Sequence, residues 1–311
     1  FADDTHLLTS MNLSTISSSR SNIETCISNI HQWCASRGLQ LNPDKTELIW
    51  PGSIANIYKL KSIDNTITVG SVTINPSESV RDLGVQFDCQ LSMRSHVSKI
   101  SSICFYHLRR LRQLKHILNT ATRHRLACAL ILTRIDYCNS VLAGLPATTL
   151  APLQRVMNAA ARFVLGLGPR DHITSALASL HWLPVASRIQ FKLCILMHAI
   201  VNGNAPTYLD NSVTDISSLP FRASLRSASA GKYDIPATRT RFGDRAFSIA
   251  GPRAWNLLPD DIRSISSLPS FKNKLKTHLF TLAYTDASDI SLILFLSVSV
   301  LSSLCLYSCL Y

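Results

Sequence analysis

The chain has 311 residues, enough for two or three domains and a sizeable core, and its hydrophobic content is an ordinary 46%. Its formal net charge of +12 is unevenly placed: residues 1–90 hold six Lys/Arg and nine Asp/Glu, whereas residues 91–285 hold 25 Lys/Arg and eight Asp/Glu. A basic excess can simply aid solubility, but one concentrated in the later part of the chain favours nucleic acid as a partner. The nine scattered cysteines form no CxxC pair, which argues against a zinc finger and for reduced thiols in an intracellular protein.

The first four residues, Phe1-Ala2-Asp3-Asp4, place two carboxylates side by side next to apolar residues. Adjacent carboxylates repel each other unless a cation holds them, and their oxygens suit a divalent metal. The alternative is an ordinary solvated turn, because so short a motif is only a hypothesis. The sequence has no signal peptide and no initiator methionine, so we expect a fragment whose first residue is not a domain boundary.

A helix is predicted from Ser21 to Arg37. Apolar residues recur there at three- and four-residue steps, Ser21 and Glu24 have the spacing of a capping box, and Gly38 follows as a C-terminal cap. Apolar runs and turn residues then predict short strands at residues 39–42 and 45–50 and over residues 57–88, with a hairpin at 67–74 and a further strand at 79–88. Gly84 inside the last of these strands marks a bulge or a close approach of another backbone.

From residue 92 the apolar periodicity predicts helices, over residues 92–118, 123–135, 152–167, 172–180, 184–201 and 271–280. Residues 91–140 contain nine Lys/Arg but only one acid, Asp136, whereas a solvated helix face usually carries both signs. A cationic outer face of this kind can follow a phosphate backbone. The cations assigned to this role are Arg109, Arg110, Arg112, Lys115, Arg123 and Arg125.

Three later segments lie outside these helices. Residues 211–235 are rich in serine and are predicted to form a loop. Residues 239–247 interleave arginines with phenylalanines, which suits either backbone contact with base stacking on nucleic acid or an exposed irregular hairpin. Residues 290–311 carry no charge and have the length of a membrane span, but they lack flanking basic anchors, so translated non-coding sequence is the alternative.

Several of these stretches occur in the order found in one family. The chain resembles the C-terminal part of a reverse transcriptase from a non-LTR (LINE-type, jockey-like) retrotransposon, over about residues 1–284. The elements that carry the resemblance are Phe1-Ala2-Asp3-Asp4, Gly38-Leu39-Gln40-Leu41-Asn42-Pro43-Asp44-Lys45-Thr46, Arg81-Asp82-Leu83-Gly84-Val85, Arg241-Phe242-Gly243, Gly251-Pro252-Arg253-Ala254-Trp255-Asn256-Leu257-Leu258-Pro259 and Ser270-Phe271-Lys272. The first element alone is weak, but the first three in register are specific. A group II intron maturase carries a similar acidic turn but is a poorer match after Arg239.

The resemblance implies an α+β fold. Residues 1–88 would be the remnant of a right-hand polymerase palm, with antiparallel strands and a helix, and residues 89–170 would be a mostly helical thumb. A helical, basic C-terminal region would cover residues 171–285, followed by an apolar tail over residues 286–311. In such enzymes two Mg²⁺ ions join the primer 3′-hydroxyl to the incoming nucleotide.

The resemblance also implies roles for particular residues. Asp3 would bind metal, and Asp4 would support the site. Lys45, on local grounds a surface lysine, matches the family's lysine that protonates or steadies the pyrophosphate. The primer grip would be Leu83, Gly84 and Val85. The basic helices would hold the RNA template and DNA primer by their backbones, and deoxynucleotides would be the substrates of the intact enzyme.

The third metal-binding aspartate and the fingers of such an enzyme have no counterpart in this sequence, so the resemblance predicts a polypeptide that does not polymerise by itself. Two other functions stay open. One is a non-catalytic basic module that binds nucleic acid, and the other is a membrane-anchored interaction protein that uses residues 290–311. The predicted location is intracellular, nuclear or cytoplasmic, with membrane anchoring as the less favoured alternative.

Overall fold

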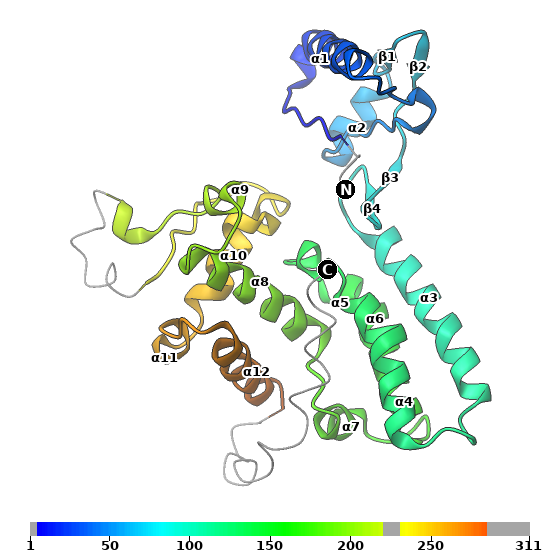
Figure 1. Cartoon of the computed structure of the whole chain (residues 1–311), viewed down its shortest axis with the longest axis vertical. Coiled ribbons are helices and arrows are strands. Elements are labelled where there is room, and N and C mark those ends of the chain that lie inside the picture. Colours follow the sequence, from blue (N-terminus) through cyan, green and yellow to red (C-terminus); the bar gives the residue numbers. More distant parts are fainter. Residues whose placement is uncertain (1–4, 220–230, 285–311) are drawn as a thin grey trace. The chain divides into compact units, whose positions relative to one another are not determined.

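The computed structural model describes residues 5–219 and 231–284. The chain divides into two compact units, Phe1–His96 and Val97–Tyr311, and each is described by itself (Figure 1). The fold is mixed α+β, as predicted, because the helices that dominate it are accompanied by two small antiparallel sheets in the first unit. Asp3, Asp4 and residues 290–311 lie outside the described residues. None of the described helices combines the length and apolarity needed to cross a bilayer.

The first unit, in its described residues, combines two helices with two β-hairpins. Their bounds are α1 Ile16–Ser36, α2 Ile54–Leu60, β1 Ile67–Val69, β2 Val72–Ile74, β3 Ser79–Asp82 and β4 Val85–Asp88, with short 3-10 helices at Leu13–Thr15 and Pro43–Lys45. β1 pairs with β2 around Gly70, whose φ of 62° suits a hairpin turn, so this predicted hairpin is confirmed. β3 pairs with β4 as a second hairpin.

The second hairpin corrects the prediction of one continuous strand over residues 79–88. The chain reverses at Leu83 and Gly84, which have left-handed φ values of 43° and 85°. Two adjacent residues of this kind match the twist of a tight hairpin. Gly84 therefore forms the turn of the hairpin and is not a bulge inside a strand.

The strand predicted to begin at residue 57 is also wrong, because residues 57–60 belong to helix α2, which the Ser53 side chain caps by accepting the Asn56 N–H.

The strands predicted over residues 39–50 are also absent from the structure. Pro43–Lys45 is a 3-10 helix, and the side chain of Asn42 accepts a backbone N–H of that turn. Only Leu48 makes a β-bridge, to Pro76. The apolar alternation was real, but no neighbouring strand among the described residues pairs with this stretch along its length.

Helix α1 begins earlier than predicted. It starts at Ile16, so Ser21 is not its cap and the capping-box prediction is wrong. Glu24 has another partner, because its carboxylate accepts the backbone N–H of Thr68 in β1 at 2.8 Å. The predicted end is confirmed, since Gly38 follows the helix with a left-handed φ of 70°.

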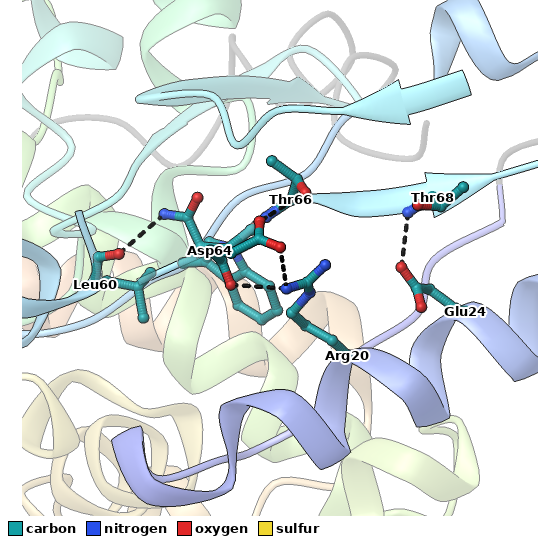
Figure 2. A network of polar contacts seen from close by, with 8 residues as sticks. Arg20, Glu24, Leu60, Asp64, Thr66 and Thr68 are labelled. Atoms are coloured by element: carbon teal, nitrogen blue, oxygen red, sulfur yellow. Dashed lines mark hydrogen bonds and ion pairs between the residues drawn. The ribbon is translucent and has the colours of Figure 1, made fainter. Parts of the chain in front are cut away.

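A polar network connects α1 to the chain that enters β1 (Figure 2). The Arg20 guanidinium donates to the backbone oxygen and to the carboxylate of Asp64, at 2.9 and 2.8 Å. The Thr66 hydroxyl donates to the other carboxylate oxygen at 2.9 Å. These donors, Arg20 first, stabilise the ionised carboxylate and hold the pKa of Asp64 below its ordinary value of 3.8. Together with Glu24 they fix the face of α1 that the β1–β2 hairpin approaches.

An apolar groove of about 740 Å³ is lined by the inner face of α1. Ile23, Ile27 and Ile30 of this face are only half-buried. Other apolar residues that line the groove are Leu41, Leu48, Ile49, Trp50, Ile57, Leu60, Ile67, Val69 and Ile74. Within α1 only Ile16 and Cys34 are buried. The first unit therefore has a thin core, and the apolar stripe that predicted α1 is not fully covered.

The second unit is helical throughout its described residues. Its helices are α3 Arg94–Gln113, which starts in the first unit, α4 Thr120–Ala127, α5 Thr133–Asp136, α6 Ala147–Leu165, α7 Ile173–Ser179, α8 Val185–Val201, α9 Thr207–Asp210, α10 Phe247–Asn256, α11 Asp260–Arg263 and α12 Leu268–Tyr284. A π-helical turn, Cys128–Leu132, joins α4 to α5, and 3-10 helices lie at Asn139–Leu142, Ile216–Ser218 and Gly243–Arg245. The predicted helices over residues 152–167, 172–180, 184–201 and 271–280 are confirmed, with ends shifted by a few residues.

The apolar stripe predicted for the first long helix is confirmed in part. Val97, Cys104, Leu108 and Leu111 of α3 are buried. The stripe was expected to continue through residue 118, but α3 ends before Leu114, whose side chain is 47% exposed. The cations that follow Leu111 therefore lie at the end of the helix and in the turn after it.

Helix α8 lies at the centre of the second unit, where α6, α10 and α12 all pack on it. Trp255 in α10 and Phe271 in α12 are fully buried, and their ring centroids are 5.7 Å apart. Gly251 lets α10 approach α8 closely, because a Cβ there would lie 3.0 Å from the Met197 sulfur. The stretch of residues 251–259 that contributed to the resemblance therefore supplies core packing.

The cysteines among the described residues are free thiols. Cys104 and Cys194 are completely buried. Burial disfavours the thiolate and raises the pKa of Cys104 to about 11 and that of Cys194 to about 12. These two residues act as small core side chains.

His198 in α8 makes the stability of the second unit depend on pH. Its ring is buried and stacks on Phe271 with centroids 4.2 Å apart, and its Nε2 lies 2.8 Å from the Ile265 carbonyl oxygen. Burial lowers the pKa of His198 below its ordinary value of 6.5, although hydrogen bonds to the carbonyls of Ile265 and Ser266 oppose the shift. The unfolded chain therefore takes up a proton before the folded chain does. We expect the free energy of unfolding to fall as the pH drops below about 6.5.

Guanidinium unfolding followed by far-UV circular dichroism, at about pH 7.5 and about pH 5.5, measures this dependence. The variant His198→Gln keeps an N–H donor but does not titrate, so its midpoint should change less between the two pH values than the midpoint of the parent. His107 and His124 also have lowered pKa values, but they titrate in both proteins and their effects cancel. Equal pH dependence in parent and variant would contradict the role of His198.

Candidate nucleic-acid interface

The C-terminal half of α3 presents a cationic face. Leu108 points inward and is fully buried, so positions beside it on the helix point outward. The exposed cations are Arg109, Arg110 and Arg112 on the helix and Lys115 in the turn after it. These side chains are available to a partner, and their contact with a phosphate backbone stays a prediction.

Tyr106 adds an aromatic ring to this face. The residue is 48% exposed, its hydroxyl accepts a hydrogen bond from Arg110 Nη1 at 3.0 Å, and the guanidinium carbon lies 5.8 Å from the ring centroid. Contact with the ring restricts the guanidinium and leaves its other N–H groups for a ligand. Tyr106 was not among the predicted site residues, although its spacing four positions before Arg110 on a helix indicates such a contact.

Arg134 of α5 adds positive charge beside α3, close enough to affect His107 and Cys104. Burial, followed by the charges of Arg134 in α5 and of Arg110, lowers the pKa of His107 below its ordinary value of 6.5. Arg134 also favours the thiolate of Cys104, against the larger effect of burial. Arg134 therefore lies close to α3, although it comes from another helix. It falls within the predicted basic run, but the sequence could not indicate which helix face it would join.

Arg123 is engaged by the protein itself. Its Nη1 donates to the carbonyl oxygen of Phe163 at 3.1 Å, in the last turn of α6, where a cation offsets the partial negative charge of the helix end. Lys115 is near Arg123, because both approach Gly166. A Cβ added to Gly166 would lie 3.6 Å from Arg123 Nη1 and 3.9 Å from Lys115 Nζ. Arg123 therefore has a structural part, whereas Arg125 on the same helix is exposed.

Asp136, the one acid of residues 91–140, does not neutralise the positive charge of that stretch. Asp136 Oδ2 pairs with Arg188 Nη1 of α8 at 2.5 Å, and the Arg188 Nε donates to the Leu183 carbonyl oxygen at 3.0 Å. The side chains of Asp136 and Arg188 are 26% and 16% exposed, so the pair is largely shielded from solvent. Because a cation from outside the stretch neutralises this carboxylate, the nine Lys/Arg of residues 91–140 keep their full excess.

The predicted site residues of the first unit lie on turns. Lys45 is exposed at the end of Pro43–Lys45. Leu83 and Gly84 are exposed at the apex of the β3–β4 hairpin, whereas Val85 is 3% exposed at the start of β4. No group of three His, Cys, Asp or Glu residues among the described residues could hold a metal ion. The carboxylates predicted to bind Mg²⁺ lie outside the described residues, so their role stays a prediction.

Comparisons with known proteins add no family to this picture. No family model matches the chain, and no curated protein or solved structure matches it significantly. The resemblance to a reverse transcriptase therefore stays a prediction. What the described residues supply is a helical unit with a cationic face on α3 and further exposed cations, Arg125 and Arg134, on α4 and α5.

Proposed function

We propose that the second unit binds the phosphate backbone of nucleic acid through the outer face of α3 and the cations beside it. The observation that carries the proposal is the positive excess of residues 91–140, whose single acid, Asp136, is paired with Arg188 from outside this stretch. A polyanion with regularly spaced phosphates is the partner that such a surface attracts. The residues proposed to contact phosphates are Arg109, Arg110, Arg112, Lys115, Arg125 and Arg134, whereas Arg123 of α4 is held against the end of α6.

In the proposed parent protein this surface is the thumb of an RNA-directed DNA polymerase, and the first unit is a remnant of its palm. The thumb would hold the RNA template and the DNA primer. When bound, Mg²⁺ would stabilise the charge that develops during nucleotidyl transfer. Binding of nucleic acid is the activity proposed for the described residues, because the cationic face of α3 lies among them. Lys45 and residues 83–85 keep, as part of this proposal, the roles that the resemblance gives them.

Binding of this kind should not depend on base sequence. Phosphates are identical at every position of a duplex, so contacts to them fix a protein on the nucleic acid without reading it. The α3 cations also lie on the outer side of a helix, where they can follow a backbone without entering a groove. Sequence preference would require side chains that reach the base edges.

A salt titration of the full chain tests the proposal. Fluorescence anisotropy with a labelled duplex of about 20 base pairs gives the affinity between about 50 and 200 mM KCl. We expect log affinity to fall linearly with log salt, with a slope of about −0.9 for each phosphate contacted. With about five contacts, the affinity falls roughly 500-fold over this range.

A second duplex of equal length and different sequence is the control, and it should bind with the same affinity. Vesicles of neutral lipid provide the comparison with a membrane partner. A slope near zero, or affinity for the vesicles in place of the duplex, would overturn the proposal.

A further inference from the structure

The turn before α10 presents an aromatic ring between two arginines. Phe242 is 56% exposed, and Arg239 and Arg241 beside it are exposed as well. Within the parts of the chain that the structure describes, neither arginine has an acidic partner. None of these residues belongs to the α3 face, so the turn is a separate feature of the second unit.

Hydrogen bonds within the turn hold it in one shape. The Thr238 hydroxyl donates to the Asp244 carboxylate, and the Thr240 hydroxyl oxygen accepts the Gly243 N–H at 3.0 Å. The backbone N–H of Asp244 donates to the Thr240 carbonyl oxygen at 3.1 Å. Gly243 permits this closure, because a Cβ there would lie 3.3 Å from the Thr240 hydroxyl oxygen. The turn therefore restricts where the Phe242 ring can lie.

The turn is also anchored to the rest of the second unit. The Nε of Arg245 donates to the Ala143 carbonyl oxygen at 3.4 Å, and a Cβ on Gly144 would come 2.9 Å from the Cγ of Arg245. Arg253 of α10 lies 3.8 Å from the Asp244 carboxylate. The acid and one arginine of the turn are therefore used inside the protein, and the two remaining arginines flank the exposed ring.

The exposed side chains match one ligand chemistry. The exposed Phe242 ring lies between two exposed arginines on one ordered turn, and this combination suits a ligand that is both flat and negatively charged. An unpaired base stacks on an aromatic ring whatever its identity, and the phosphates on either side of it carry the charge that arginines bind. A base inside a duplex is already stacked on its neighbours and cannot occupy this place.

We infer that the turn of residues 238–245 is a binding site for single-stranded nucleic acid. One unpaired base stacks on Phe242, and the flanking phosphates pair with Arg239 and Arg241. The site gives the C-terminal region a role that phosphate contact by α3 does not supply, and it does not depend on that contact. An acidic peptide is the competing partner, because it also carries regularly spaced negative charge.

Binding of a fluorescent single strand to the full chain tests the inference. The probe has about 12 nucleotides and carries 2-aminopurine, whose emission is quenched by stacking, and it is used as DNA and as RNA. Phe242→Ala should weaken single-strand binding about 10-fold and remove the quenching, whereas Phe242→Trp should preserve both. Duplex affinity should be the same in parent and variants. Both probes should respond alike, because stacking does not use the 2′-hydroxyl.

Leu257→Ala is the matched control, since Leu257 is 70% exposed at the end of α10 and has no part in the inferred site. Arg241→Gln should lower the salt slope for the single strand by about 0.7. The inference fails if Phe242→Ala binds the single strand as tightly as the parent does, or if it loses as much affinity for the duplex as for the single strand. It also fails if the variant weakens binding of the DNA probe but not of the RNA probe, or the reverse. It also fails if polyglutamate of equal charge displaces the probe as well as a second single strand does. Variants of the α3 cations should keep the effect of Phe242→Ala, which separates a failure here from a failure of backbone binding by α3.

Discussion

Replacing Arg109 and Arg112 together by glutamate should weaken duplex binding roughly 100-fold at about 100 mM salt. The change removes two proposed phosphate contacts and adds two negative charges that repel the backbone. The slope of log affinity against log salt should become shallower by about 1.8, because each lost contact retains its counterions on the duplex. Anisotropy with the labelled duplex over the salt range measures both quantities.

The matched control is the pair Arg170→Glu and Lys274→Glu, which changes the net charge equally at exposed positions on other elements. This control should lower the affinity by no more than about 3-fold, through the general field of the protein. Glutamates near the C-terminus of a helix interact unfavourably with the helix dipole and could destabilise α3. The neutral pair Arg109→Gln and Arg112→Gln is therefore measured as well, and it should also weaken duplex binding, by a smaller factor. Far-UV circular dichroism checks that each variant is folded. Equal losses in the α3 and control pairs would show that total charge attracts the duplex and that α3 has no special part.

Trp255→Ala should destabilise the second unit by about 3–5 kcal/mol. Trp255 is 1% exposed and its ring lies next to that of Phe271, so truncation opens a cavity between α10 and α12. The indole N–H also donates to the Gly231 carbonyl oxygen at 3.0 Å, and the variant leaves that oxygen without this donor. A loss of this size is a large part of the stability of an ordinary domain.

Guanidinium unfolding followed by far-UV circular dichroism measures this loss, since most of the described helix lies in the second unit. Trp33→Ala is the control for removing an indole: Trp33 is 57% exposed on α1, and its loss should change stability by about 0.5 kcal/mol or less. Similar midpoints for Trp255→Ala and the parent would mean that α10 and α12 repack around the missing ring.

Helices were predicted best where the apolar side of the helix is buried along the whole helix. The stripe of α3 and the helix α8 follow the expected spacing because their inward residues meet other helices. The start of α1 could not be predicted, because Glu24, three residues after Ser21, has a partner on β1 and not at the helix end. A capping-box spacing cannot indicate whether a distant backbone N–H competes for the glutamate.

Turns and long-range pairs account for the rest of the differences. Leu83 adopts a left-handed φ, which a leucine rarely does, so alternation alone suggested a continuous strand where the chain reverses. In the candidate site, the run of cations was evident from the sequence. The pairing of Asp136 with Arg188, 52 residues later, was not, and neither was the approach of Arg134 to α3. Such contacts depend on how helices pack, which local spacing does not determine.

One helix sets a limit on how the chain can be divided. Helix α8 packs on α6, α10 and α12, and its Arg188 supplies the guanidinium that pairs with Asp136. The core of the second unit therefore joins segments that lie before α8 in the sequence to segments that lie after it. Ending the chain at residue 170 would leave the partly shielded Asp136 carboxylate without its counterion and the side of α6 that packs on α8 open to water. The helices expected to grip nucleic acid and the helices that follow them therefore share one core, centred on α8.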